Sequence, residues 1–340
     1  FCMLLNFGGN VGLYGKLQHV VDEYYKARHS KFASTLKGVG LTMEGIENNP
    51  IMYELVSELP WRNNKFGWQE WLNSYVEARY GNINNTKVHD AWMLLARSVY
   101  GASDKVLEQG CHESVLCARP ALDVYQVSSW SEMEEFYNPD DVIRAAQLMV
   151  EASHEVKANA NFRYDLVDIT RQAIAEKARY VYAEIVAAYR AKDRKMFDYT
   201  TKRFLDIILQ QDRLLSSMPD FMVGTWIRSA RNLGTNTQES NHYEWNARVQ
   251  ITTWGNRDAA EKGGLREYAH KEWNGVLADF YYPRWKVYFE ALVDTFDGKP
   301  MKNIDFYAMD EAWTHKHNVY PYEAQGDAVE FAQKAAAEVL

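Results

Sequence analysis

Hydrophobic and polar positions near the start of the chain follow a pattern of alternating strands and helices. Residues 1–7 form a short, mostly apolar run, which is typical of a strand buried on both faces. Residues 16–29 carry apolar side chains at helical spacing, and residues 38–43 form a second strand-like run. A further helix is predicted to begin at Asn49-Pro50, because proline is favoured at the first helical position. Strand, helix, strand, helix is the order of an α/β sheet or barrel.

The pattern changes after about residue 61, where strand signals fade and amphipathic helical spacing takes over. The predicted helices cover residues 68–80, 86–100, 139–156, 162–192, 195–215, 239–253, 265–297 and 327–340. Pro283 lies within the 265–297 segment and is expected to kink or break it. The predicted fold is therefore an α/β portion, of a sheet or a barrel, joined to a large all-helical domain.

Composition excludes several classes of protein. The formal net charge is -8 and no basic stripe occurs, so nucleic acid is not an expected partner. No apolar run approaches the roughly 18 to 20 residues that span a bilayer. Cys2, Cys111 and Cys117 cannot all pair, and either a Cys111–Cys117 bridge or two buried thiols fits the sequence. The 11 Trp and 22 Tyr suit either sugar stacking or helix interfaces, and most are expected to fill interfaces.

The sequence matches few general catalytic or cofactor-binding motifs. The glycine-rich stretch 8–15 matches neither the dinucleotide fingerprint nor the phosphate-binding loop. The pairs His270/Glu272 and His315/His317 have no third ligand at a suitable spacing, so no metal site is predicted. No nucleophile elbow occurs, and no organic cofactor is expected.

Glu44 is the strongest catalytic candidate because it follows the second predicted strand. Active sites of parallel barrels are built at the carboxyl ends of their strands. Met43 can help to desolvate the carboxylate, and Gly45 lets the chain turn sharply behind it. A glutamate at such a place can instead cap the following helix.

Several segments, in order along most of the chain, resemble one enzyme family. They are Cys2-Met3-Leu4-Leu5-Asn6-Phe7-Gly8-Gly9-Asn10, Met43-Glu44-Gly45-Ile46 with Tyr53 and Trp61, Ala78-Arg79-Tyr80-Gly81, Arg97-Ser98-Val99-Tyr100, Phe162-Arg163-Tyr164-Asp165-Leu166-Val167-Asp168, Thr253-Trp254-Gly255 and Tyr281-Tyr282-Pro283-Arg284-Trp285. The sequence resembles the alpha-N-acetylglucosaminidase family, glycoside hydrolase family 89. That resemblance implies a catalytic (β/α) barrel of the TIM type, whose end would be residues 1–62. It also implies a large all-helical C-terminal domain over residues 63–340.

The resemblance also implies a reaction. Members are exo-acting retaining glycosidases that remove terminal alpha-linked N-acetylglucosamine from glycans of the glycosaminoglycan or mucin type, without metal or cofactor. Glu44 matches the nucleophile of the double displacement. The acid/base glutamate of the family lies upstream, so no residue is assigned to it here. Glu47, three positions after Glu44, is expected to cap a helix or lie on the surface.

Six further positions match residues that line the sugar site in this family. Leu4 and Phe7 lie at the end of the opening strand, Trp254 matches a ring that packs on the sugar, and Leu265 and Tyr268 belong to the same wall. His112 matches a histidine that reaches the active site, with a polar loop residue as the alternative. The spacing from Trp254 to Tyr268 includes an inserted segment, residues 257–263.

The opening run is expected to be a strand entered midway, which predicts a missing upstream part of the same protein as a partner. The isolated chain is then expected to be inactive on unactivated glycosides. The alternative is a non-catalytic helical module that binds carbohydrate or serves as structure. Relatives act outside the cytoplasm, so an extracytoplasmic place (bacterial periplasm, secreted or lysosomal) is expected.

Overall fold

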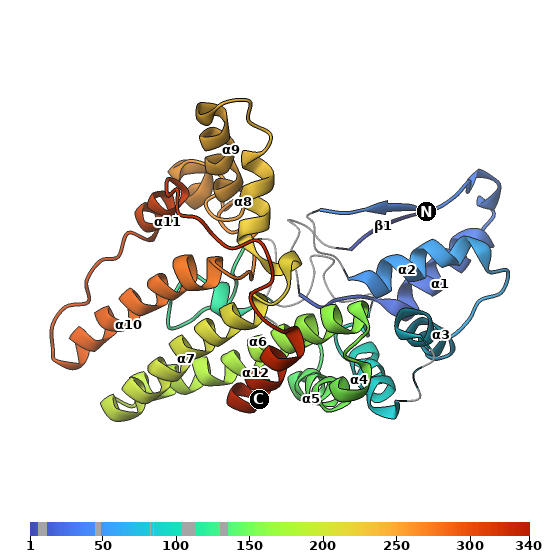
Figure 1. Ribbon diagram of the computed structural model, residues 1–340, viewed down its shortest axis with the longest axis horizontal. Coiled ribbons are helices and arrows are strands. Elements are labelled where there is room, and N and C mark those ends of the chain that lie inside the picture. Colours follow the sequence, from blue (N-terminus) through green and yellow to red (C-terminus); the bar gives the residue numbers. More distant parts are fainter. Residues whose placement is uncertain (6–11, 45–48, 82, 84, 104–112, 130–134) are drawn as a thin grey trace.

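The computed structural model describes residues 1–5, 12–44, 49–81, 83, 85–103, 113–129 and 135–340. Its amino-terminal portion pairs two short parallel strands, β1 (Cys2–Leu4) and β2 (Gly40–Thr42), with Leu4 opposite Thr42. Helix α1 (Leu17–Arg28) connects them, and α2 (Pro50–Glu58) follows, with its proline in the first turn as predicted. The strand–helix–strand–helix order from the sequence is confirmed (Figure 1).

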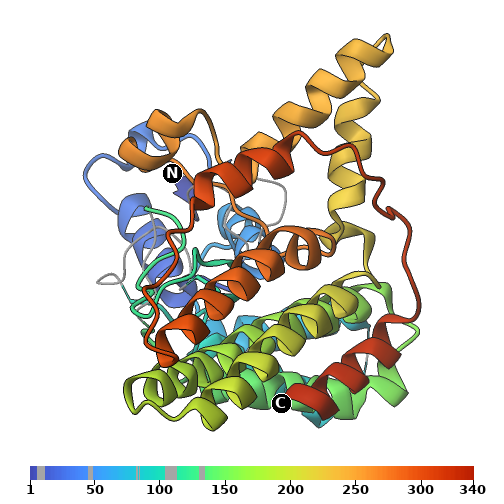
Figure 2. The ribbon, with the colours of Figure 1, turned by 90° about the vertical axis from the view of Figure 1, so that its left-hand side faces the viewer.

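The rest of the chain is helical. Its helices are α3 (Trp68–Tyr80), α4 (Thr86–Arg97), α5 (Pro139–Val156), α6 (Ala160–Arg190), α7 (Arg194–Leu215), α8 (Val223–Arg231), α9 (Thr237–Gln250), α10 (Tyr282–Phe296), α11 (Phe306–Thr314) and α12 (Ala328–Val339). The long helix α6 packs between α5 and α7, and α12 lies against all three. Helices α8 and α9 form a hairpin that projects from this body (Figure 2). The α/β portion followed by a helical domain matches the predicted fold class.

Helix α6 is buried over most of its length because it is central. Its start is capped by Asn159, whose side-chain oxygen accepts a hydrogen bond from the Phe162 N–H at 2.9 Å. Burial extends to polar residues, which therefore need partners. Asp165 is bound by the Arg79 guanidinium and accepts a hydrogen bond from the Tyr80 hydroxyl at 2.6 Å. This contact joins α3 to α6 through two residues of a segment already singled out in the sequence.

The prediction of one helix over residues 265–297 is wrong. The chain there makes turns, then a π-helical turn at Leu277–Tyr281, and only then α10, in which Pro283 occupies the first turn. Asp212 of α7 accepts hydrogen bonds from the Gly275 N–H at 2.6 Å and the Ala278 N–H at 3.1 Å, which fixes the segment across α7. Gly275 has φ +86°, a conformation that favours glycine. The prediction failed because residues 270–277 are all buried, polar ones included, so the apolar positions there form no single face.

Helices α8 and α11 were not predicted. Each has nine residues, as α2 has, but neither begins with an Asn-Pro signal such as the one that marked α2. Most aromatic side chains fill the interior as expected, with Trp71, Trp273 and Trp285 almost fully buried. Cys117 is a buried free thiol, whereas Cys111 lies outside the described residues. None of the helices in the described part of the chain combines the length and apolar character that a membrane span needs.

Candidate active site

The first side of the candidate site is the shared edge of β1 and β2. The strands are parallel, so Leu4 and Thr42 end their strands next to each other. Glu44 follows Thr42 by two residues and is half-buried, as Leu4 is. Two residues predicted from separate segments are thus brought to one edge by the register of the sheet. Phe7, predicted beside them, lies outside the described residues.

The second side comes from the helical domain and contacts Glu44 directly. The Tyr268 hydroxyl donates a hydrogen bond to Glu44 Oε2 at 2.9 Å, across 224 residues of sequence. Such a bond to an ionised carboxylate is stronger than one between neutral groups. A strand-end carboxylate and a residue of the predicted sugar-binding wall therefore share one contact.

Trp254 completes this side. Its ring meets that of Tyr268 edge to face, with centroids 4.9 Å apart and planes at 61°. Trp254 has φ +60°, and its N–H donates to the Val249 carbonyl at 2.8 Å, which ends α9. Its side chain stays 36% exposed. An accessible indole beside a tyrosine and a carboxylate is a surface on which the apolar face of a pyranose ring can pack.

The inserted segment does not separate Trp254 from Tyr268. Residues 252–268, here called the 252–268 loop, leave and return at one place, because the Glu267 N–H donates to the Thr252 carbonyl at 2.7 Å. The insertion contributes a π-helical turn at Asp258–Lys262, away from that closure. Leu265 is held by its N–H to the Ala259 carbonyl at 3.2 Å, and its own carbonyl accepts the Tyr268 N–H at 3.2 Å.

His112 is the remaining predicted site residue, and it lies outside the described residues. The next residue, Glu113, is buried and accepts hydrogen bonds from the Ser128 N–H at 3.0 Å and the Ser128 hydroxyl at 2.7 Å. Burial raises the pKa of Glu113 to about 7 and lowers the pKa of His270, 3.8 Å away, to about 4. Near neutral pH His270 is therefore neutral, and its Nδ1 faces the Glu267 carbonyl at 3.1 Å rather than forming an ion pair with Glu113.

His270 and Glu272 do not converge on a common point. His270 faces Glu267, whereas Glu272 accepts a hydrogen bond from the Ser114 hydroxyl at 2.8 Å. In the described ranges, no group of three or more His, Cys, Asp or Glu side chains is arranged to hold a metal ion.

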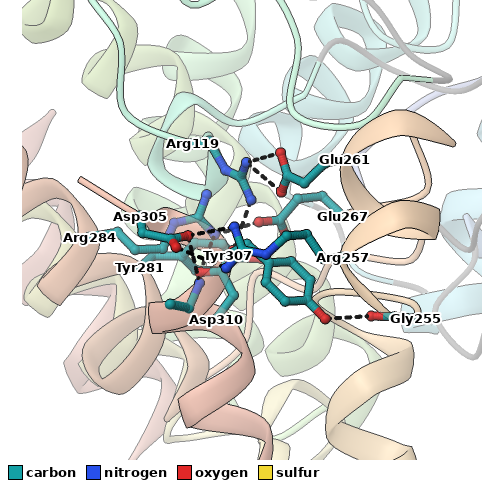
Figure 3. Close-up of polar contacts among 11 residues, drawn as sticks. Arg119, Gly255, Arg257, Glu261, Glu267, Tyr281, Arg284, Asp305, Tyr307 and Asp310 are labelled. Carbon is teal, nitrogen blue, oxygen red and sulfur yellow. Dashed lines mark hydrogen bonds and ion pairs between the residues drawn. The ribbon is translucent and has the colours of Figure 1, made fainter. Parts of the chain in front are cut away.

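Sequence reasoning missed a network of charged residues at the 252–268 loop, of which three are buried and two are partly exposed. It contains Arg119, Glu261, Glu267, Arg284 and Asp310 (Figure 3). Arg284 belongs to the Tyr281–Trp285 segment that carried part of the family resemblance, so one signal was present. The ion pairs themselves could not be predicted from the sequence, because their members are spread over almost two hundred residues.

Comparison with known proteins gives consistent matches. The family model "Alpha-N-acetylglucosaminidase (NAGLU) C-terminal domain" matches residues 71–338, and that of the corresponding tim-barrel domain matches residues 1–63. Human alpha-N-acetylglucosaminidase is 34% identical over 341 residues, which cover 98% of this chain and 44% of the human protein. The chain thus spans less than half the length of this curated relative.

Solved structures agree. A family 89 glycoside hydrolase from Clostridium perfringens, in complex with 2-acetamido-1,2-dideoxynojirmycin, matches with a TM-score of 0.93 and 31% identity, over 100% of this chain and 39% of that one. A form of the Clostridium perfringens enzyme in which two glutamates are replaced by glutamine, in complex with its substrate GlcNAc-alpha-1,4-galactose, matches with a TM-score of 0.93 and 30% identity, over 99% of this chain and 38% of that one.

Proposed function

This chain belongs to the alpha-N-acetylglucosaminidase family, glycoside hydrolase family 89, and we propose that it is the C-terminal part of a retaining exo-glycosidase that releases terminal alpha-linked N-acetylglucosamine. Residues 1–62 would complete the catalytic barrel and residues 63–340 would form the helical domain. Support for the substrate comes from the bacterial relative that binds GlcNAc-alpha-1,4-galactose. The glycan to which the sugar is attached is left open between glycosaminoglycan and mucin type.

The observation that carries this proposal is the hydrogen bond from Tyr268 to Glu44. It joins the strand end, where a barrel places its catalytic groups, to the aromatic wall of the helical domain. A sugar lying against Trp254 and Tyr268 would be next to the Glu44 carboxylate. No other acidic residue of the described chain was predicted for this role.

Glu44 would act as the nucleophile. Its carboxylate attacks the anomeric carbon, so the C1–oxygen bond to the aglycone breaks and a glycosyl ester forms. The departing oxygen takes a proton from the acid/base glutamate, which we propose lies in a part of the protein outside the present sequence. Water then attacks the same carbon, gives its proton to that residue, and frees Glu44 as a carboxylate. Both steps invert the carbon, so the overall configuration is retained.

The remaining predicted residues would shape the pocket. Trp254 would pack on the sugar ring, Leu4 would line the strand-end side, and Leu265 would support Tyr268 from the neighbouring turn. Phe7 and His112 are proposed to take part on the resemblance alone. None of these roles involves a metal or an organic cofactor.

The test is hydrolysis of an aryl alpha-N-acetylglucosaminide with a good leaving group by the full-length protein and its Glu44→Ala variant. An activated leaving group needs little acid assistance, so the assay isolates the nucleophile. We expect the rate to fall by about a thousandfold or more. Added azide should restore turnover and give the glycosyl azide of inverted configuration. Glu47→Ala, three residues away, is the matched control and should keep its activity.

A Glu44→Ala variant with an intact rate would contradict the proposal. The reading of the chain as a non-catalytic helical module that binds carbohydrate would then be favoured. Loss of activity without rescue by azide would place Glu44 in the site but not in the covalent step.

A further inference from the structure

A chain of paired charges, buried at Glu267, Arg284 and Asp310, lies next to the aromatic side of the site. Arg119 binds both carboxylate oxygens of Glu261 at 2.8 Å and reaches Asp310 at 3.1 Å. Arg284 binds Glu267 and lies 3.8 Å from the other oxygen of Asp310. Figure 3 shows these residues converging from the 252–268 loop, α10, α11 and the segment 113–129 that carries Arg119. Two arginines are thus shared among three carboxylates.

Glu267 is the member of this network closest to the site, because Tyr268 is the next residue. Its side chain is about 1% exposed and its φ is +60°, a strained conformation for a residue other than glycine. Such a conformation persists only where the surroundings hold it. Here the Glu267 N–H closes the loop on Thr252, and its carboxylate binds Arg284 and accepts the Tyr281 hydroxyl at 3.3 Å.

Arg284 is held as firmly as its partner. It follows Pro283 in the first turn of α10, and its side chain is about 1% exposed. Its guanidinium lies over the Phe280 ring, 4.9 Å from the centroid. Burial of a charged group is tolerated when the charge is paired. The pair therefore ties the strained residue to a rigid helix.

We propose that the Glu267–Arg284 pair positions Tyr268 for catalysis. It holds the left-handed turn at Glu267, and this turn directs the Tyr268 hydroxyl to Glu44. Arg119 holds the middle of the loop through Glu261, so the loop is anchored at two points between Trp254 and Tyr268. Neither Glu267 nor Arg284 contacts the reacting atoms; both act through Tyr268. The inference rests on the proposed function, in which Glu44 is the nucleophile.

An exposed ion pair in the same loop provides the matched control. Arg257 binds Asp305 at 2.8 and 2.9 Å, also visible in Figure 3, but both side chains are about half exposed. Solvent-exposed pairs contribute little to structure. Arg257→Ala should therefore leave the position of Tyr268 unchanged, although it changes the same loop.

The experiment is a double-mutant cycle in the full-length protein with an activated aryl alpha-N-acetylglucosaminide. Tyr268→Phe and Glu267→Gln should each lower kcat about tenfold. The kcat of the double variant should be within about threefold of that of the less active single variant, because the effects of residues that act through one contact are not additive. Arg284→Lys keeps the charge but loses the planar fork, and should fall between the parent and Glu267→Gln. Arg257→Ala should match the parent.

Two results would overturn the inference. One is multiplication of the two single effects in the double variant, which would indicate a general loss of stability. The other is full activity in Glu267→Gln. If Glu267→Gln does not fold, Arg284→Lys in the Tyr268→Phe background tests the same coupling.

A second measurement is independent of activity and separates this inference from the proposed function. Amide hydrogen exchange over residues 252–268 should be faster in Glu267→Gln than in Arg257→Ala, because the closure at Thr252 is loosened. Equal exchange in the two variants would overturn the positioning role. An inactive parent protein with the expected exchange would instead refute the proposed function alone.

Discussion

The two sides of the proposed site are held in different ways. On the strand side, Leu4 and Glu44 lie at or just beyond the end of a parallel pair whose strands have three residues each. On the helical side, Trp254 and Tyr268 belong to a loop that is closed on itself and tied to α10 by the buried Glu267–Arg284 ion pair. The strand side depends on local register, and the helical side on contacts between distant segments. Substitutions in the helical domain should therefore change activity when they move Tyr268, and should change only stability when they do not.

The largest effect expected from a change outside the site is at the contact between α3 and α6. Arg79→Ala removes the guanidinium from Asp165, whose pKa burial already raises against the opposing effect of Arg79. Breaking a buried pair leaves one charge without its partner, so we expect a loss of about 3 to 5 kcal/mol in the free energy of unfolding. Urea denaturation measures it.

Arg144→Ala is the control for that change, because Arg144 and Glu151 form an exposed pair at 3.1 Å. Its effect should be much smaller than that of Arg79→Ala, because exposed ion pairs contribute little to stability. Equal effects of Arg79→Ala and Arg144→Ala would show that the buried pair does not connect the helices as described.

A smaller and pH-dependent effect is expected at Glu113. Its pKa is about 7 in the folded protein and 4.5 ordinarily, so the folded state holds the proton longer. The stability it contributes is full below pH 4.5 and is lost as the pH rises through about 7, by about 3 kcal/mol in all. In Glu113→Gln this part of the decline should disappear from unfolding free energies measured between pH 4.5 and 8.

His270 has the opposite sign, because its lowered pKa removes stability as the pH falls from 6.5 towards 4. The quantity to compare is therefore the difference in the free energy of unfolding between the parent and Glu113→Gln at each pH. A constant difference across the range would contradict the raised pKa of Glu113.

The smallest expected effect is on substrate binding, when the Trp254 ring is removed. Trp254→Ala should raise KM roughly three- to tenfold with little change in kcat, because the ring would bind substrate and transition state alike. Trp254→Phe should recover most of the loss. A fall in kcat with unchanged KM would instead assign Trp254 to the reacting centre, beside Tyr268.

Local pattern was enough for the elements with one clear apolar face. Helices α3 and α5 begin and end as predicted, and the strand that leads to Glu44 is present. The pattern failed between residues 265 and 281, because residues 270–277 are all buried and show no single apolar face. It also failed for α8 and α11, which have nine residues each and do not begin with an Asn-Pro signal such as the one that marked α2.

For the candidate site, residue chemistry and resemblance pointed to Glu44, Leu4, Trp254 and Tyr268 from the sequence, and the structure brings Tyr268 to Glu44 and Trp254 to Tyr268. No sequence pattern indicated Glu267 and Arg284 as a pair. Their contact depends on a left-handed turn and on the placement of α10 after an irregular segment.

The sequence by itself determined the α/β and helical parts, the family, and the residue types available for catalysis, because periodicity, turn residues and motifs are local properties of the chain. Only the tertiary structure decided which of those residues meet. The Tyr268–Glu44 hydrogen bond spans 224 residues, and the ion pairs behind it join segments far apart in the chain. Such contacts form when buried charges must find partners within a packed interior, and a linear pattern does not record that requirement.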